Sequence, residues 1–162
     1  MEKDFVIACD VDGVINAFGD ENFSRSDMQD KMLYDAEGNP RVNLTFSPTA
    51  IAELNSLAEV MNFFMLTSWN VRVRELQQAG LACLPFLMIN RGSEESEKKS
   101  KIQHIIHLAS VHGEVLWIDD FAEEWFSELP ENIQKVVRPI QTNHLQGFEA
   151  KDFAKIMEII QP

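Results

Sequence analysis

Two aspartates directly follow a short apolar segment near the beginning of the chain. Asp10 and Asp12 come immediately after segment 5–9, which consists of Phe, Val, Ile, Ala and Cys. Side chains two residues apart on an extended strand point to the same side, so we expect the two carboxylates to lie close together. At about 4 Å and an effective dielectric constant of about 20, like charges repel by roughly 4 kcal/mol. A chain keeps such a pair where a cation or a reaction uses it, and Gly13 then allows a sharp turn or a close ligand.

Two further apolar segments also end in polar side chains. Segment 61–66 runs into Thr67 and Ser68, and segment 115–118 runs into Asp119 and Asp120. Short apolar segments of this kind are typical of buried parallel strands, and ligands of parallel α/β sheets bind at the carboxyl ends of the strands. The sequence therefore predicts four carboxylates and two hydroxyls at one edge of a sheet. Such a donor set, with no obvious arginine beside it, predicts a divalent cation with oxygen ligands, most simply Mg²⁺.

Strands and helices are expected to alternate along the chain. Strands are predicted at 5–9, 61–66, 84–89 and 115–118, with a fifth marked by 136–137. The predicted helices begin at Pro48 after a Ser47 N-cap, span 70–79 up to Gly80, follow the charged loop 91–99, and span 121–129 and 149–160. Repeated strand–helix units predict an α/β fold with a mainly parallel, five-stranded sheet. We expect one domain over residues 1–162.

The segment 17–46 is too long for an ordinary loop. Segments 31–34 and 41–46 flank Asp35-Ala36-Glu37-Gly38-Asn39-Pro40, a sequence that favours a turn, so they predict a β-hairpin. Because this insertion follows the first strand and its aspartates, we expect it to form a flap over the site.

Composition restricts the class of protein. The chain has 162 residues, a net charge of −12 and 45% hydrophobic residues. Such acidity argues against nucleic-acid binding through phosphates, although a small phosphorylated substrate remains compatible with it.

Cys9 and Cys83 are interpreted as buried thiols. The sequence shows neither a signal pattern nor a membrane-spanning segment, so we expect a soluble cytoplasmic protein.

The order of these motifs resembles the haloacid dehalogenase-like (HAD) superfamily. The order is an Asp-x-Asp-Gly-Val segment from Asp10, an apolar strand ending at Thr67 and Ser68, a lysine-bearing helix, and an apolar strand ending at Asp119 and Asp120. The pattern covers nearly the whole chain and is similar to a compact, nearly capless branch. The resemblance implies a Rossmann-like three-layer sandwich and a Mg²⁺-dependent phosphohydrolase that forms an aspartyl-phosphate.

The resemblance also implies a role for each acidic residue. Asp10 matches the nucleophile, and Asp12 matches the general acid/base. Asp119 matches a metal ligand, with Asp120 as a second ligand or as its outer neighbour. Asp10 and the backbone carbonyl of Asp12 would complete the protein ligands. Considered alone, Asp119 and Asp120 could instead cap the helix that follows them.

The residues that would bind the phosphoryl group follow segment 61–66 or lie on the helix before segment 115–118. Thr67 matches the hydroxyl that binds phosphoryl oxygens, and the backbone amides of Ser68 and Trp69 could add donors. The Trp69 ring is interpreted as packing rather than stacking on substrate, and Asn16 is a candidate for the cleft wall. The catalytic cation is predicted among Lys98, Lys99 and Lys101. We choose Lys101, which directly precedes the apolar helix face, with Lys98 second.

Three functions remain compatible with the sequence. The first is a phosphatase, whose open site would accept a small phosphorylated substrate such as a nucleotide or sugar phosphate, or a phosphoprotein. A partner subunit could close that site, so a homo-oligomer is left open. The second is a non-catalytic or regulatory binding module that keeps the fold. The third is a phosphotransferase that uses the same aspartate chemistry.

Overall fold

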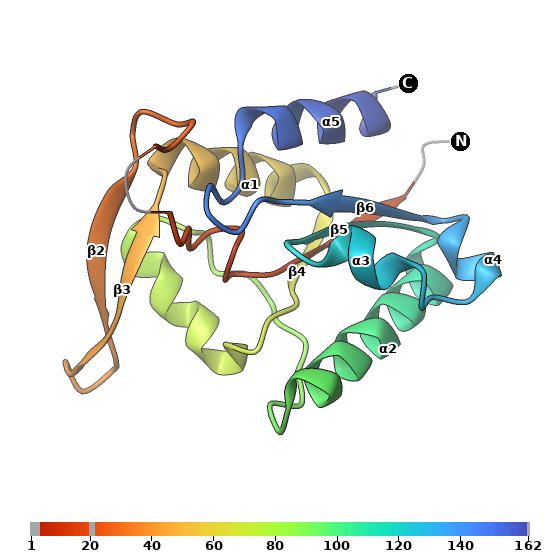
Figure 1. Cartoon of the computed structure of the whole chain (residues 1–162), viewed down its shortest axis with the longest axis horizontal. Helices are drawn as coiled ribbons and strands as arrows, with labels where there is room; N and C mark the ends of the chain where they lie inside the picture. The colour runs from red at the N-terminus through yellow and green to blue at the C-terminus, as the bar shows by residue number, and fades with distance from the viewer. Residues whose placement is uncertain (1–3, 20–21, 162) are drawn as a thin grey trace.

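A parallel sheet of four strands forms the centre of the protein. The structure, a computed structural model, describes residues 4–19 and 22–161. The strands lie in the order β4 (Asn62–Met65), β1 (Phe5–Cys9), β5 (Glu114–Asp119) and β6 (Val137–Gln141). All neighbouring strands run parallel. The chain goes from β1 to β4 on one side and then to β5 on the other (Figure 1), so the strand order reverses at β1. The predicted α/β fold is confirmed.

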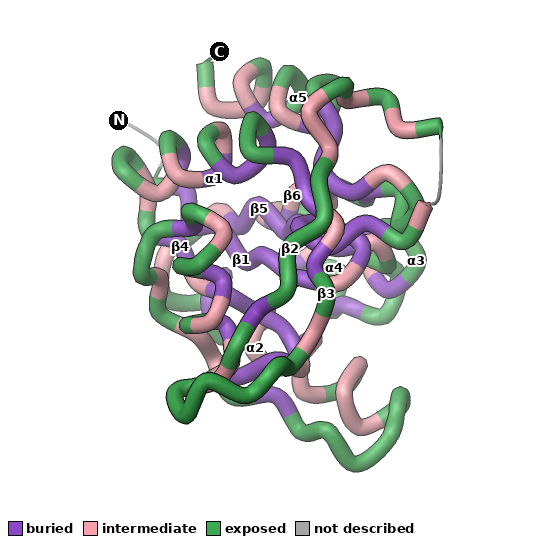
Figure 2. The backbone as a smooth tube through the Cα atoms, turned by 90° about the vertical axis from the view of Figure 1, so that its left-hand side faces the viewer, coloured by how far each residue is buried: buried purple, intermediate pink, exposed green. Residues whose placement is uncertain are grey.

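Helices cover both faces of this sheet and complete three layers. The helices are α1 (Pro48–Val60), the 3₁₀ helix η1 (Asn70–Ala79), α2 (Glu94–His112), α3 (Ala122–Phe126), α4 (Glu131–Gln134) and α5 (Ala150–Ile160). Side chains of β1 alternate between two apolar clusters, because successive strand residues point to opposite faces. Phe5, Ile7 and Cys9 pack in the cluster with α1 and α5, whereas Val6 and Ala8 pack with α2 and α3. Figure 2 shows the central strands as the buried part of the chain.

A β-hairpin stands apart from the sheet. It consists of β2 (Gln29–Tyr34) and β3 (Pro40–Phe46), which pair antiparallel, as predicted. Leu33 and Leu44 face the core while most other hairpin side chains are exposed. The backbone N–H of Tyr34 donates to Gln78 Oε1 (3.0 Å), and Gln78 Nε2 donates to the Tyr34 carbonyl (2.8 Å). The hairpin therefore packs against η1. Residues 20 and 21 of the predicted insertion lie outside the described residues.

The prediction of five strands in the sheet is wrong. Segment 84–89 contributes a single bridge, between Phe86 and Met65, and forms no strand. Pro85 has no N–H to donate to a neighbouring strand. The side chain of Asn70 takes the backbone groups of Ile89, accepting from its N–H (2.7 Å) and donating to its carbonyl (3.0 Å). The backbone groups needed for a longer strand pairing are thus absent or already used.

The predicted loop 91–99 is also wrong, because α2 begins within it. Ser93 caps the helix by accepting the backbone N–H of Ser96 on its Oγ (3.1 Å). Glu94, Glu95 and Glu97 occupy the first turn, where negative charge interacts favourably with the helix dipole. The early start adds two helical turns before the apolar face, and it places Glu94 and Glu97 on the same helix as Lys101.

Smaller differences concern helix type, strand length and one cysteine. Segment 70–79 is a 3₁₀ helix without a side-chain cap, and its β-branched Val71 and Val73 have low α-helix propensity. The last strand, β6, extends well beyond 136–137, with Pro139 tolerated because β6 is an edge strand. Cys9 is buried, as predicted, but Cys83 is exposed.

Within the described residues, no helix combines the length and apolarity needed to cross a membrane.

Asp27 fixes the start of α1. Its carboxylate accepts hydrogen bonds from Ser47 Oγ (2.6 Å), Thr49 N–H (2.9 Å) and Thr49 Oγ1 (2.6 Å). Ser47 Oγ in turn accepts from the backbone N–H of Ala50, as expected of an N-cap. The hydrogen bonds from Ser47 and Thr49 lower the pKa of Asp27 from 3.8 to about 2. The segment before the hairpin is thereby attached to α1.

This attachment should depend on pH. A carboxyl group with a lowered pKa stabilises the fold fully above its ordinary value of 3.8, and the contribution disappears as the pH falls to about 2. Asp27→Asn should therefore lower the urea midpoint at pH 6, and the gap to wild type should narrow as the pH falls below 4. Asp4→Asn, at an exposed aspartate before β1, is the control. A gap that stays constant with pH would contradict the assignment.

Candidate active site

A buried lysine joins two aspartates at the carboxyl edge of the sheet. Asp10 directly follows β1, and Asp119 is the last residue of β5. Lys101 comes from α2, and its Nζ donates to Asp10 Oδ2 and to Asp119 Oδ2, both at 2.8 Å. The lysine is 1% exposed, and both aspartates are buried. Two strands and one helix thus meet in a single charged cluster.

This arrangement keeps Lys101 protonated. Burial alone would lower its pKa, but the charges of Asp10 and Asp119 outweigh burial and hold the pKa above its ordinary value. Lys98 lies outside this cluster and instead pairs with Glu95 (3.3 Å) and Glu128 (2.7 Å). Lys99 is exposed. Among the three predicted lysines, the structure therefore brings Lys101 to the aspartates.

Three carboxylates in this cluster could hold a divalent cation. Asp10, Asp119 and Asp120 offer oxygen atoms that all lie within 4.8 Å of one another. Burial and the charges of Asp119 and Asp10 raise the pKa of Asp120 to about 7. Burial also raises the pKa of Asp10 to about 7, although Lys101 opposes the shift. The acids are thus close, desolvated and only partly neutralised, and their hard oxygen donors suit a divalent cation.

The Asp12 carboxylate lies in the same cavity but outside that group of three. Its Oδ1 accepts a hydrogen bond from Asn16 Nδ2 and its Oδ2 accepts one from the Trp69 indole N–H, both at 3.1 Å. Asn16 Oδ1 accepts in turn from the backbone N–H of Thr45 in β3 (3.1 Å). Asn16 and the Trp69 ring, which the sequence predicted only as a wall residue and as packing, therefore orient Asp12. The role of its backbone carbonyl as a ligand stays a prediction.

Gly13 lets the backbone turn directly after Asp12, next to the Asp120 side chain. Its φ is +79°, a conformation that L side chains rarely adopt. A Cβ at this position would lie 2.5 Å from Asp120 Oδ2. A glycine is therefore required next to Asp120. The close approach of a ligand at Gly13 stays a prediction.

Thr67 and Ser68 follow β4, as predicted, but they face different surroundings. Ser68 lines the cavity next to the aspartates. Thr67 is buried, and its Oγ1 accepts the backbone N–H of Trp69 (3.3 Å). The Trp69 amide is thereby used within the loop itself. Their predicted contacts with phosphoryl oxygens stay predictions.

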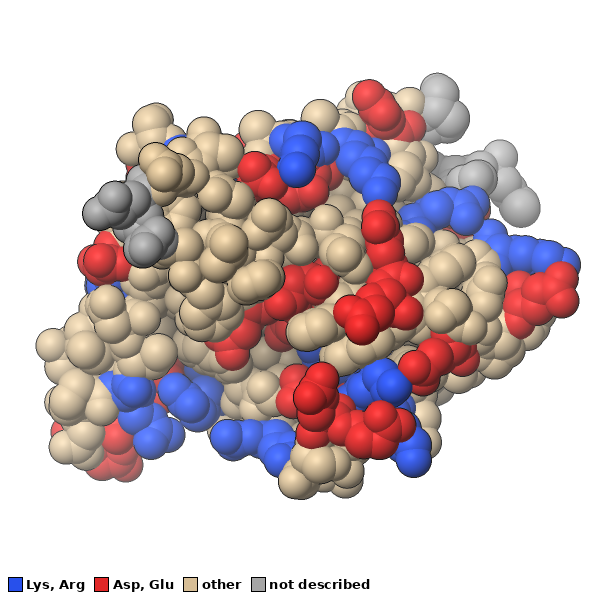
Figure 3. Space-filling model, in the orientation of Figure 1, with Lys and Arg blue, Asp and Glu red and all other residues tan. Residues whose placement is uncertain are grey.

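A cavity of about 340 Å³ opens over these side chains. It is lined by Asp10, Asp12, Ser68, Glu94, Glu97, Lys101, Asp120, Phe121 and Trp125. Described hairpin residues do not belong to this lining, so the hairpin does not form the expected flap over the cavity. Figure 3 shows acidic side chains gathered near the middle of the face of the molecule that is viewed in Figures 1 and 3.

Sequence reasoning missed four of these lining residues. Glu94 and Glu97 precede Lys101 by seven and four residues, the spacing of one helix face. That signal was hidden because segment 91–99 was predicted to be a loop. Phe121 and Trp125 follow Asp120 and were assigned only to a short helix.

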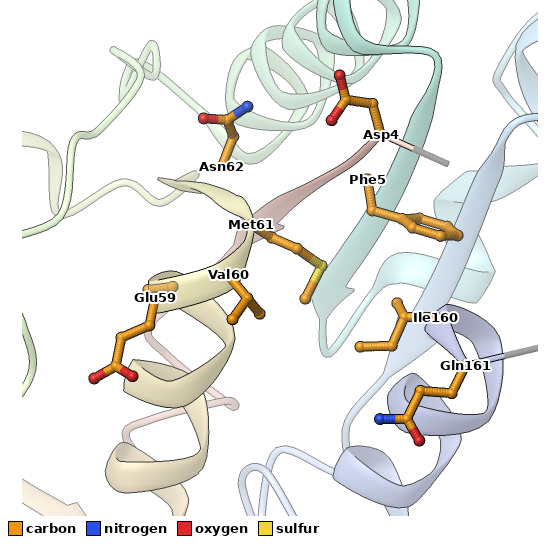
Figure 4. A pocket seen from close by; sticks show the side chains of 9 residues that line it. Asp4, Phe5, Glu59, Val60, Met61, Asn62, Ile160 and Gln161 are labelled. Carbon is orange, nitrogen blue, oxygen red and sulfur yellow. The ribbon is translucent and has the colours of Figure 1, made fainter. Parts of the chain in front are cut away.

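A larger cavity, of about 640 Å³, lies at the opposite end of the strands (Figure 4). Asp4 and Phe5 at the start of β1, Met61 and Asn62 at the start of β4, and Ile160 of α5 are among its lining residues. Its lining residues include none of the three clustered aspartates. The smaller cavity is therefore the candidate active site, because the charged side chains converge there.

Replacing Lys101 should destabilise the protein strongly. Lys101→Met leaves Asp10 and Asp119 buried without their cation, a change that costs about 3–5 kcal/mol of unfolding free energy. Lys98→Met is the matched control, because its pairs with Glu95 and Glu128 are more exposed and should contribute little to stability. Urea unfolding at neutral pH measures both. Equal losses in the two variants would show that the buried pair does not hold these elements together.

Comparisons with known proteins add a remote structural likeness. Neither the family models nor the curated proteins give a match to the chain. Among solved structures, the cobalt-bound form of the deoxy-D-mannose-octulosonate 8-phosphate phosphatase (YrbI) from Haemophilus influenzae is similar to it over 98% of this chain and 87% of that chain. The sequence identity is 18% and the TM-score is 0.45. At this distance the fold rests on the chain's own strand order, and the chemistry rests on its own side chains.

Proposed function

We propose that the protein is a phosphohydrolase that cleaves a phosphomonoester through an aspartyl-phosphate on Asp10, with Mg²⁺ as its cofactor. The observation that carries this proposal is the Lys101 ammonium held between Asp10 and Asp119 at the end of β1. Asp12 lies in the same cavity, two residues after Asp10. A carboxylate nucleophile, a second carboxylate and a fixed cation are the groups that two-step phosphoryl transfer needs.

The proposed reaction has two displacements. An oxygen of Asp10 bonds to phosphorus while the bond from phosphorus to the leaving oxygen breaks, and Asp12 gives its proton to that oxygen. Water then attacks phosphorus, Asp12 takes the proton from water, and the bond between phosphorus and Asp10 breaks. Phosphate leaves, and both aspartates return to their starting forms.

Other side chains prepare these steps. Lys101 fixes the orientation of Asp10 and places positive charge beside it, while Asn16 and Trp69 hold both oxygens of Asp12. Asp10, Asp119 and Asp120 would hold Mg²⁺, together with the backbone carbonyl of Asp12. When bound, Mg²⁺ supplies positive charge beside the phosphoryl oxygens. The substrate is a small phosphomonoester or a phosphoprotein.

Release of phosphate from 4-nitrophenyl phosphate tests this function directly. Wild type should release phosphate with Mg²⁺ and much less after chelation. Asp10→Asn removes the nucleophile and should lower kcat by roughly a thousandfold or more. Asp12→Asn keeps the nucleophile and should lower kcat by roughly 10²- to 10⁴-fold. Asp4→Asn, at the opposite end of β1, should leave activity unchanged.

The outcome separates the candidate functions. Activity that survives Asp10→Asn would contradict the aspartyl-phosphate. Absence of turnover in wild type, with Mg²⁺ still stabilising the fold, would instead support a binding module.

Mg²⁺ should also change stability. Binding to the folded form raises the melting temperature, and Asp120→Asn should reduce that increase.

The pKa of Asp120 should also affect the metal-free protein. Because this pKa is raised from 3.8 to about 7, the contribution of Asp120 to the free energy of unfolding falls as the pH rises from 3.8 to about 7. Asp120→Asn removes this loss and should stabilise the metal-free protein above pH 7. Thermal unfolding is measured with and without Mg²⁺ at the same ionic strength, which is adjusted with KCl, so that general charge screening does not explain the result. An equal increase in melting temperature with Mg²⁺ in wild type and in Asp120→Asn would contradict the site.

A further inference from the structure

Two stacked aromatic rings form one wall of the candidate active site. The rings of Phe121 and Trp125 lie 4.8 Å apart, centroid to centroid, at an interplanar angle of 7°. Trp125 is 7% exposed, whereas Phe121 is 37% exposed, and both line the cavity with Asp10 and Asp12. Phe121 therefore presents apolar ring surface inside a cavity whose other walls are mainly charged.

The position of this stack is fixed by the charged cluster. The backbone N–H of Phe121 donates to Asp119 Oδ1 (2.9 Å), and Asp119 Oδ2 accepts from Lys101. The Nζ of Lys101 also lies 5.5 Å from the centroid of the Trp125 ring, within cation–π range. The rings thus have a defined place relative to Asp10, which is also bound to Lys101.

The cavity has room for more than a phosphoryl group. Its volume of about 340 Å³ lies at the lower end of the range of small-molecule pockets. With phosphorus next to Asp10, the remaining space is available to the leaving group, and Phe121, Trp125, Glu94 and Glu97 are among the residues that line the cavity. An aromatic face beside that space favours a planar ring by offset stacking.

The charges at the cavity rim disfavour a second anionic group. Glu94 and Glu97 lie one turn apart at the start of α2 and both line the cavity. The nearby Lys98 is paired with Glu95 and Glu128 rather than with them. Among the residues that the structure describes, the one cation paired with Glu97 is Lys101 (3.9 Å), which is bound more closely by Asp10 and Asp119. The rim therefore stays negative.

We propose that Phe121, supported by Trp125, is the specificity-determining residue of a leaving-group subsite for planar aromatic alcohols that carry no second negative charge. This inference rests on the proposed phosphatase function. It names the class of substrate: phosphomonoesters of uncharged aromatic alcohols are preferred over those of saturated alcohols and over bisphosphates or carboxylated esters.

Benzyl phosphate and cyclohexylmethyl phosphate test the ring preference, because both are esters of primary alcohols and differ mainly in ring planarity. Wild type should show the lower KM for benzyl phosphate. Phe121→Leu should raise that KM by roughly two- to tenfold, the range expected from loss of an aromatic pair, with kcat and the KM for cyclohexylmethyl phosphate little changed. Phe121→Tyr should restore the preference.

Phe18→Leu is the matched control, because Phe18 is an exposed phenylalanine that does not line the cavity. It should leave both KM values unchanged. Charge is tested with 4-carboxybenzyl phosphate, which wild type should bind more weakly than benzyl phosphate. Glu94→Gln should narrow that difference, because it lowers the KM for 4-carboxybenzyl phosphate more than the KM for benzyl phosphate.

The results distinguish this inference from the function on which it rests. Equal KM values of wild type for benzyl phosphate and cyclohexylmethyl phosphate, or an equal KM increase for both esters in Phe121→Leu, would overturn the subsite while phosphatase activity stands. If wild type hydrolyses none of the esters and no 4-nitrophenyl phosphate, the proposed function fails first. Binding of benzyl alcohol, followed by NMR, then decides the subsite: loss of binding in Phe121→Leu but not in Phe18→Leu supports it, and any other result overturns it.

Discussion

The ion pairs of Lys101 with Asp10 and Asp119 determine how the rest of the site is arranged. Burying an unpaired ammonium would cost several kcal/mol, and the two carboxylates at 2.8 Å offset that cost. Because the partners end β1 and β5, the lysine also fixes α2 against the carboxyl edge of the sheet. One positive charge cannot neutralise three clustered carboxylates. The remaining negative charge suits a divalent cation at this edge of the sheet.

The hairpin contributes to the site as a support and not as a cover. The backbone N–H of Thr45, in β3, binds Asn16, and Asn16 binds Asp12. Trp69 holds the other oxygen of Asp12, and the Arg72 guanidinium lies over the Trp69 ring at 5.1 Å from its centroid. Thr45 of the hairpin, through Asn16, and Trp69, which directly precedes η1, thus both hold the Asp12 carboxylate. The insertion after β1 orients a carboxylate that the sequence alone placed only approximately.

The sequence predicted best what local patterns determine. The strands near 5–9, 61–66 and 115–118 and the choice of Lys101 followed from apolar segments and the polar residues at their ends. Segment 84–89 had the same apolar composition, yet Pro85 and the side chain of Asn70 remove its backbone groups from pairing. Such competition is a tertiary effect, invisible in composition. The charged composition of segment 91–99 conceals the helix that begins after the Ser93 cap and so conceals the place of Glu94. Only packing shows that the Phe121 ring stays partly exposed.

Three consecutive residues at the end of β5 combine different tasks. Asp119 binds Lys101, Asp120 joins the carboxylate group, and Phe121 forms the aromatic wall. The hydrogen bond from the Phe121 N–H to Asp119 Oδ1 holds the Phe121 backbone beside Asp119, and the Phe121 ring stacks on Trp125. In the proposed mechanism, a leaving group that stacks on Phe121 would be positioned by the same backbone that positions the charges around Asp10. Selection of the leaving group and alignment of phosphorus with Asp10 would then depend on one strand end, so that a substrate fitting the wall would be placed for attack.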